Sequence, residues 1–218
     1  MKTTVLLLAA VLSCANASFL LDYTLPDSVI QLMGLREKPT NRAISVCQDI
    51  QFNYCQARFN EFFGFSPEKF LEMNVTEFTK VCNTRTQFYQ CLGTSYYSCL
   101  SLFTLLNRPN PDFPNTFDYV RTFRGLEYAC TGGFQEVAFQ WDCLGTFPTT
   151  NSYKNCITQF NATVGNDLCS AVDATGQCLN DAYRAACNDA GAGFFGCENF
   201  RSTFSDACWG LRCQVNQF

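Results

Sequence analysis

Apolar residues recur every three to four positions along most of this chain, the spacing of helices that bury one face. Nowhere is there a sustained alternation of β-branched and polar residues, which is typical of strands. The pattern therefore predicts an all-α protein, a multi-helix bundle. The segments that carry it are 41–63, 76–106, 117–144, 153–163, 167–187 and 194–209.

Residues that favour helix ends divide these segments. Ser66-Pro67 predicts the start of a short helix that ends near Asn74, and Thr76 is expected to cap the helix after it. Between Phe117 and Leu144 we expect two helical segments, interrupted near Gly125 or at Gly132-Gly133. The other predicted stops or bends are Gly64, Gly93, Gly165, Asn188, Gly191 and Gly193.

The first 17 residues have the features of a secretory signal peptide. Lys2 precedes an apolar run from Val5 to Leu12, and Ala15-Asn16-Ala17 places small residues where a signal peptidase cleaves. The run is far shorter than the roughly 20 residues that cross a bilayer. We therefore expect a secreted, extracellular protein that does not span the membrane. Residues 18–40 are predicted to form an N-terminal arm, and residues 41–218 a cysteine-rich helical domain.

Cysteines dominate that domain. The chain has 15, and removal of Cys14 with the leader leaves an even number. In an oxidising compartment, even parity at this density favours seven disulfides over free thiols or metal sites, although spacing does not reveal the pairing. The cysteines concerned are Cys47, Cys55, Cys82, Cys91, Cys99, Cys130, Cys143, Cys156, Cys169, Cys178, Cys187, Cys197, Cys208 and Cys213.

Three prolines lie within residues 107–115 and predict an extended connector there. Five of the mature cysteines precede it and nine follow it. Because both numbers are odd, full pairing requires at least one disulfide across the connector, and the expectation is a single cross-linked body. Cys47 and Cys55, two helical turns apart, are expected to bond to neighbouring elements rather than to each other.

Charge and missing histidine exclude several function classes. The formal net charge is −4, and the basic residues are scattered, so nucleic acid is not an expected partner. The chain has no His, which excludes Ser-His-Asp and Cys-His catalysis and most zinc hydrolase sites. We expect no cofactor, no metal and no enzyme activity. One catalytic alternative stays open, a carboxylate-dependent hydrolase with Glu127, Glu136 and Asp142 as its candidate acids.

Two further features suggest modification and ligand binding. Asn74-Val75-Thr76 and Asn161-Ala162-Thr163 are acceptor sequences for N-linked sugar, with Asn74 and Asn161 as the residues modified. The 22 Phe residues could build an ordinary core or line a cavity for a lipid or another small apolar ligand. The aromatic pairs that could line such a cavity are Phe62-Phe63, Tyr96-Tyr97 and Phe194-Phe195.

The order of cysteines and their neighbours resembles a known group of domains. The matching residues are Phe78-Thr79-Lys80-Val81-Cys82, Cys91-Leu92, Cys99, Glu127-Tyr128-Ala129-Cys130 and Cys143-Leu144. They resemble the secreted cysteine-rich helical domains of nematodes, both the chondroitin-proteoglycan domain and a related nematode-expanded secreted domain without assigned activity. The resemblance implies a non-enzymatic extracellular protein. Glycosaminoglycan attachment needs Ser followed by Gly, and the chain has no such dipeptide.

The leading hypothesis is a secreted, non-enzymatic glycoprotein that acts as an extracellular structural or interaction module. Its expected partner is an extracellular protein or a matrix component. A carrier of a small apolar ligand is the alternative, and the hydrolase is the second alternative.

Overall fold

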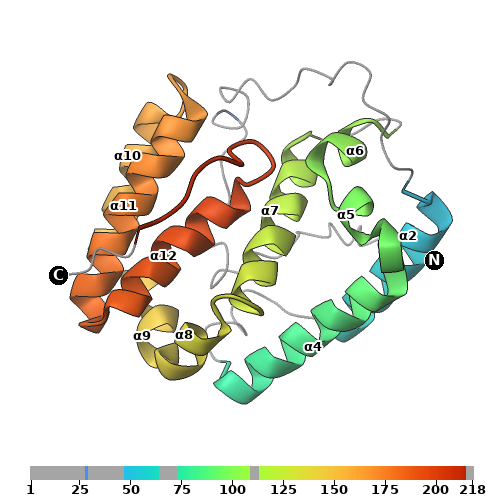
Figure 1. The fold of residues 1–218 in the computed structure, drawn as a ribbon, viewed down its shortest axis with the longest axis horizontal. Helices are drawn as coiled ribbons and strands as arrows, with labels where there is room; N and C mark the ends of the chain where they lie inside the picture. The colour runs from blue at the N-terminus through green and yellow to red at the C-terminus, as the bar shows by residue number, and fades with distance from the viewer. Residues whose placement is uncertain (1–27, 29–46, 64–72, 109–112, 215–218) are drawn as a thin grey trace, which may run out of the picture.

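The structure, a computed structural model, describes residue 28 and residues 47–63, 73–108 and 113–214. Across these residues every regular element is a helix, which confirms the all-α, disulfide-rich prediction. The expected signal peptide, the arm and the Ser66-Pro67 helix start lie outside the described residues. The arrangement has two helical groups, α2 to α6 and α10 to α12, with α7 between them and α8 and α9 at one end (Figure 1).

The first group is built on two long helices, α2 and α4, that lie side by side (Figure 1). Its elements are α2 (Asp49–Phe63), α4 (Val75–Leu92), the 3₁₀ turn η1 (Gly93–Ser95), α5 (Tyr96–Cys99) and α6 (Leu102–Leu106). Asn74, not Thr76, caps α4: its side-chain oxygen accepts from the Glu77 backbone N–H, and the Glu77 carboxylate accepts from the Asn74 backbone N–H. This reciprocal pair satisfies two N–H groups at the helix start.

The helix α4 ends where expected. Gly93 follows Leu92 with φ of 55°, a backbone conformation that a side chain would strain. The chain therefore turns sharply at this point.

Helix α7 (Phe113–Ala129) joins the two groups by packing against α4 and α6 on one side and α12 on the other. One prediction is wrong here. The connector was expected to extend to residue 115, but the helix starts at Phe113, because proline at the second helical position has no intrahelical N–H bond to lose. The helix continues through Gly125, and the interruption lies at residues 130–133, which confirms the second of the two predicted positions, Gly132-Gly133.

Capping side chains begin three of the six remaining elements. They are α8 (Phe134–Phe139), α9 (Trp141–Thr146), η2 (Phe147–Thr149), α10 (Asn151–Thr163), α11 (Leu168–Cys187) and α12 (Ala190–Thr203). Thr150, Asp167 and Asp189 each accept a backbone N–H at the start of a helix. The predicted bounds of 194–209 for the last helix are wrong, because the Asp189 cap starts it four residues earlier. Asn188 ends α11 in the left-handed conformation, as expected.

Gly191 and Gly193 do not end helices but lie inside the first turns of α12. At Gly193, a Cβ atom would come within 2.7 Å of the Asn180 backbone oxygen in α11. Glycine therefore permits the close packing of these two helices.

Replacing Gly193 by alanine is expected to lower the free energy of unfolding by roughly 1 to 3 kcal/mol, because the helices must separate. Denaturant titration measures the change. Gly210→Ala is the matched control, because nothing lies within 4 Å of its added Cβ. An equal effect of the two substitutions would contradict the packing role of Gly193.

Within the described residues, seven disulfides pair all fourteen cysteines. They are Cys47–Cys99, Cys55–Cys91, Cys82–Cys130, Cys143–Cys187, Cys156–Cys178, Cys169–Cys208 and Cys197–Cys213. Cys130, Cys143, Cys156 and Cys169 follow one another at intervals of thirteen residues, but each bonds to a cysteine outside this set. Of the seven bonds, only Cys82–Cys130 crosses residues 107–115, so a single disulfide joins the described residues before the connector to those after it.

Candidate functional site

Three tyrosines form a contiguous aromatic cluster at the end of α4, here called the tyrosine surface: Tyr89, Tyr96 and Tyr97. The ring centroids are 4.8 Å apart for Tyr89 and Tyr96 and 5.2 Å apart for Tyr96 and Tyr97, both edge to face. Tyr96 is fully buried, whereas Tyr89 and Tyr97 are 40% and 56% exposed. The turn at Gly93 brings α5 back against α4 and so places the three rings together.

A chain of four charged side chains connects this region to the rest of the protein. Arg85 of α4 is 3.2 Å from Glu127 of α7, and Glu127 is also 3.4 Å from Arg124. Arg124 in turn pairs at 2.9 Å with Asp206, whose second oxygen accepts the Leu102 backbone N–H that begins α6. The burial of these groups strengthens their attraction. These ion pairs therefore fix α4, α6, α7 and the segment after α12 relative to one another.

The ion-paired side chains also bind two tyrosines, buried Tyr96 and exposed Tyr97. The Arg85 guanidinium donates to the Tyr96 hydroxyl at 3.3 Å and lies 5.6 Å from the centre of its ring. The Tyr97 hydroxyl donates a long bond, 3.5 Å, to Glu127. Burial alone would lower the pKa of Arg124, but the Asp206 and Glu127 carboxylates raise it overall. Of the two exposed rings, that of Tyr97 is therefore tied to the ion pairs through its hydroxyl.

Burial raises the pKa of Tyr96 from 10.0 to about 12, although Arg85 opposes the shift. The unfolded chain releases this proton near pH 10, while the folded chain retains it to about pH 12, so stability falls between these values. Phenylalanine has no hydroxyl to titrate, so Tyr96→Phe should lose less of its free energy of unfolding as the pH rises. The difference from the wild type is at most roughly 2 to 3 kcal/mol across the whole range between the two pKa values.

Denaturant titrations at pH 9, 10 and 11 measure that loss. Tyr128, whose pKa burial also raises, leaves some alkaline dependence in the variant. Identical pH slopes for Tyr96→Phe and the wild type would contradict the assignment to Tyr96.

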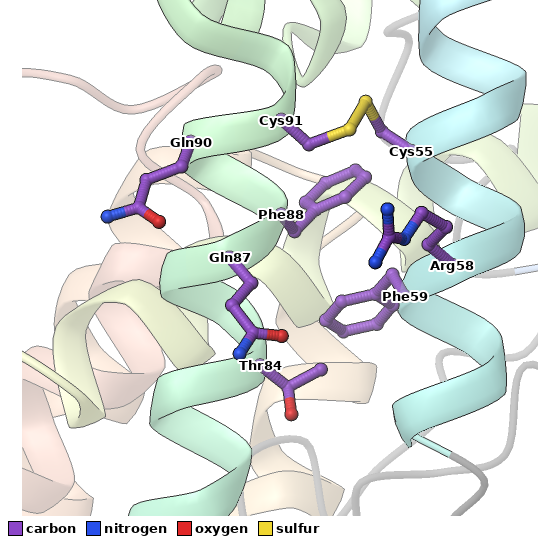
Figure 2. Close-up of a pocket in the computed structure, with 8 residues that line it drawn as sticks. All are labelled: Cys55, Arg58, Phe59, Thr84, Gln87, Phe88, Gln90 and Cys91. Carbon is purple, nitrogen blue, oxygen red and sulfur yellow. A yellow bond between two sulfur atoms is a disulfide. The ribbon is translucent and has the colours of Figure 1, made fainter.

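A groove of about 450 Å³ lies between α2 and α4 (Figure 2). Its lining residues are Cys55, Arg58, Phe59, Thr84, Gln87, Phe88, Gln90 and Cys91. The Phe59 and Phe88 rings are 5.1 Å apart, and each is 5.0 Å from Phe123 beneath them. The groove therefore combines an aromatic floor with polar side chains, and the phenyl rings are mostly used in core packing.

The three candidate acids have different surroundings. Both carboxylate oxygens of Glu127 are engaged by arginines. Glu136 belongs to α8, and its carboxylate packs against Gly191 in the first turn of α12. Burial is the main cause that raises the pKa of Glu136, and the nearby Asp189 carboxylate raises it further. Asp142 is exposed in the first turn of α9. The hydrolase stays a prediction.

The aromatic pairs expected to line a cavity divide between core and surface. Tyr96 is buried and Tyr97 is exposed, because consecutive helical residues point in directions about 100° apart. Phe195 is buried, with its ring 5.7 Å from that of Tyr128. The side chains of Phe62 and Phe63 lie outside the described residues.

The sequence analysis named Tyr96-Tyr97 as a pair that could line a cavity, but it did not place Tyr89 beside them. It also did not identify the pairing of Glu127 with Arg85. No family model, curated protein or solved structure matches the chain. The nematode-domain resemblance therefore stays a prediction. In the part of the chain that the structure describes, no helix has the length and apolarity needed to cross a bilayer, and no His, Cys, Asp and Glu side chains group as metal ligands.

Proposed function

We propose that this protein is a secreted, non-enzymatic glycoprotein that binds an extracellular protein or matrix component through the tyrosine surface. Seven disulfides support export, because such bonds persist in oxidising compartments. The predicted signal peptide supports the same conclusion. The observation that carries the binding proposal is the exposure of Tyr89 and Tyr97 beside buried Tyr96, whose hydroxyl is bound by Arg85 of the partly buried ion pairs.

Tyrosine is well suited to such a contact. It offers a large amphipathic ring with only two side-chain torsions to restrict, and it is enriched among residues that dominate binding energies. In this protein the rings of Tyr89 and Tyr97 both pack on buried Tyr96, so part of the ordering cost is met before binding. The surface is therefore preorganised for a partner.

The experiment compares retention of extracellular partners by wild-type protein and two variants. Tyr89→Ala/Tyr97→Ala should lose a bound partner at least about tenfold, the loss expected from two central aromatic contacts. Tyr54→Ala is the matched control, because Tyr54 and Tyr97 are equally exposed, at 56% each. The wild type and the two variants are biotinylated and cross-linked to their partners in the extracellular fraction of the source tissue. The proteins and glycans captured with each of them are then quantified.

Circular dichroism and thermal midpoints first establish that the three proteins are equally folded. Partners retained equally by the wild type and the double variant would overturn the assignment of binding to this surface. A partner lost only by Tyr54→Ala would place binding on α2 instead.

The α2–α4 groove favours a second candidate, a carrier of a small ligand with an apolar part and a polar part. Its volume lies within the range of ligand pockets, roughly 300 to 1,000 Å³. Native mass spectrometry and solvent extraction of the secreted protein test for such a ligand. Thr84→Trp should fill the groove and remove the ligand, whereas Asn83→Trp, one position outside the lining, should retain it. Absence of any bound small molecule from the wild type would count against a carrier.

A further inference from the structure

The two acceptor sequences for N-linked sugar have very different positions in the fold. Asn74 is exposed and extended, immediately before α4. Asn161 lies within α10 and is half-buried, and its side-chain oxygen is inaccessible to solvent. From this contrast, and resting on the proposed export, we propose that Asn74 carries an N-linked glycan in the folded protein while Asn161 carries none.

The chemistry of attachment fits Asn74. A lipid-linked pyrophosphate oligosaccharide is the donor: a bond forms between the asparagine Nδ2 and the sugar C1, the C1–O bond to pyrophosphate breaks, and Nδ2 loses one proton. The helix cap uses other atoms. Oδ1 of Asn74 accepts from the Glu77 backbone N–H at 3.0 Å, and the Asn74 backbone N–H donates to the Glu77 carboxylate at 3.0 Å. A glycan on Nδ2 therefore leaves the capping box intact.

The same modification conflicts with the packing of Asn161. Its amide oxygen is buried, and Nδ2 is bonded to the same carbon atom, so a sugar on Nδ2 would start beside the core. The preceding residue, Phe160, is fully buried, and its ring packs on Phe200 and Phe204. Transfer to a nascent chain precedes folding, so glycosylation at Asn161 would remove molecules from the folded population rather than decorate them.

The position of the glycan also separates it from the tyrosine surface. Asn74 begins α4 beside α9, where the Trp141 indole donates to the Met73 carbonyl at 2.7 Å. Tyr89 is fifteen residues further along the same helix, about 22 Å away at 1.5 Å per residue. The sugar thus marks the opposite end of α4, and its enzymatic removal should leave partner binding unchanged.

The test uses protein secreted from glycosylation-competent eukaryotic cells. Peptide-N-glycosidase treatment in heavy-oxygen water labels each asparagine that carried a glycan, and peptide mass spectrometry locates the label. Asn74→Asp and Thr76→Ala both remove the acceptor sequence and keep a capping oxygen at position 74, so both should lose one glycan without losing the fold. Thr163→Ala, which removes the other acceptor sequence, should leave the intact mass unchanged apart from the substitution.

Label at Asn74 alone supports the proposal. Label at Asn161, or at neither asparagine, in secreted protein with seven disulfides overturns it and leaves the proposed export standing. Failure of the chain to reach the medium, or free thiols in it, would instead contradict the proposed function.

Discussion

Replacing both Cys82 and Cys130 by alanine is expected to lower the free energy of unfolding by about 4 kcal/mol. The bond closes a separation of 48 residues, and the entropy that it removes from the unfolded chain grows with loop length. It is also the one cross-link between the halves. Without it, we expect the single unfolding transition to broaden or divide in two.

The matched control removes Cys197 and Cys213, whose bond closes only 16 residues within the C-terminal half. A protease site inserted after Asn110 separates the two variants further. After cleavage and denaturation without reductant, the fragments of the wild type and of the control should remain joined. Those of Cys82→Ala/Cys130→Ala should separate, and fragments that stay joined there would reveal a second bond across the connector.

Asp206→Ala is expected to lower the free energy of unfolding by roughly 2 to 4 kcal/mol. Its carboxylate accepts from the Arg124 guanidinium and from the Leu102 backbone N–H, so truncation leaves a largely buried cation and the start of α6 without this acceptor. Because Arg124 also contacts Glu127, the loss should reach the support of Tyr97. Partner binding should therefore weaken together with stability.

Asp206→Asn separates the two contributions. An amide oxygen still accepts the Leu102 N–H but carries no charge, so we expect about half the loss of the alanine variant. Guanidinium titration of the two variants measures this. Equal stability of the Asp206→Ala variant and the wild type would contradict the structural role of the ion-pair chain.

The cross-linked body was predictable because the argument from parity needs no conformation. Five cysteines before the connector and nine after it require a bond across it whatever the fold, and Cys82–Cys130 is that bond. The choice of partners was not predictable. The thirteen-residue spacing of Cys130 to Cys169 suggests a repeat. Pairing, however, is decided by which cysteines the fold brings together with their Cα atoms within about 7 Å.

The sequence predicted that the helices are present more accurately than it predicted their first residues. Thr76 was the predicted cap of α4, although Asn is also a residue type that favours this position. The reciprocal bonds between Asn74 and Glu77 favour the earlier start. Similarly, Gly191 and Gly193 suggest a helix end, but both lie inside α12, where Gly193 permits contact with α11 and Gly191 permits contact with Glu136 of α8. Packing against a distant segment decides such positions.

The candidate site depends on contacts between distant residues. Glu127 was one of the three candidate catalytic acids, yet both of its carboxylate oxygens are engaged by arginines. Its partner Arg85 lies on another helix, and Arg124, one turn away on α7, is held by Asp206. Burial of Tyr96 and exposure of Tyr97 likewise depend on the position of α5 against α4.

Disulfide mapping of the secreted protein tests the central assignment most directly. The protein is denatured without reductant, treated with a thiol-alkylating reagent and digested, and the linked peptides are identified by mass spectrometry. We predict no alkylated cysteine in the mature chain and a peptide pair joining Cys82 to Cys130 as the sole connection across residues 107–115. An alkylated mature cysteine, or any other bond across that connector, would contradict a body closed by these seven cross-links.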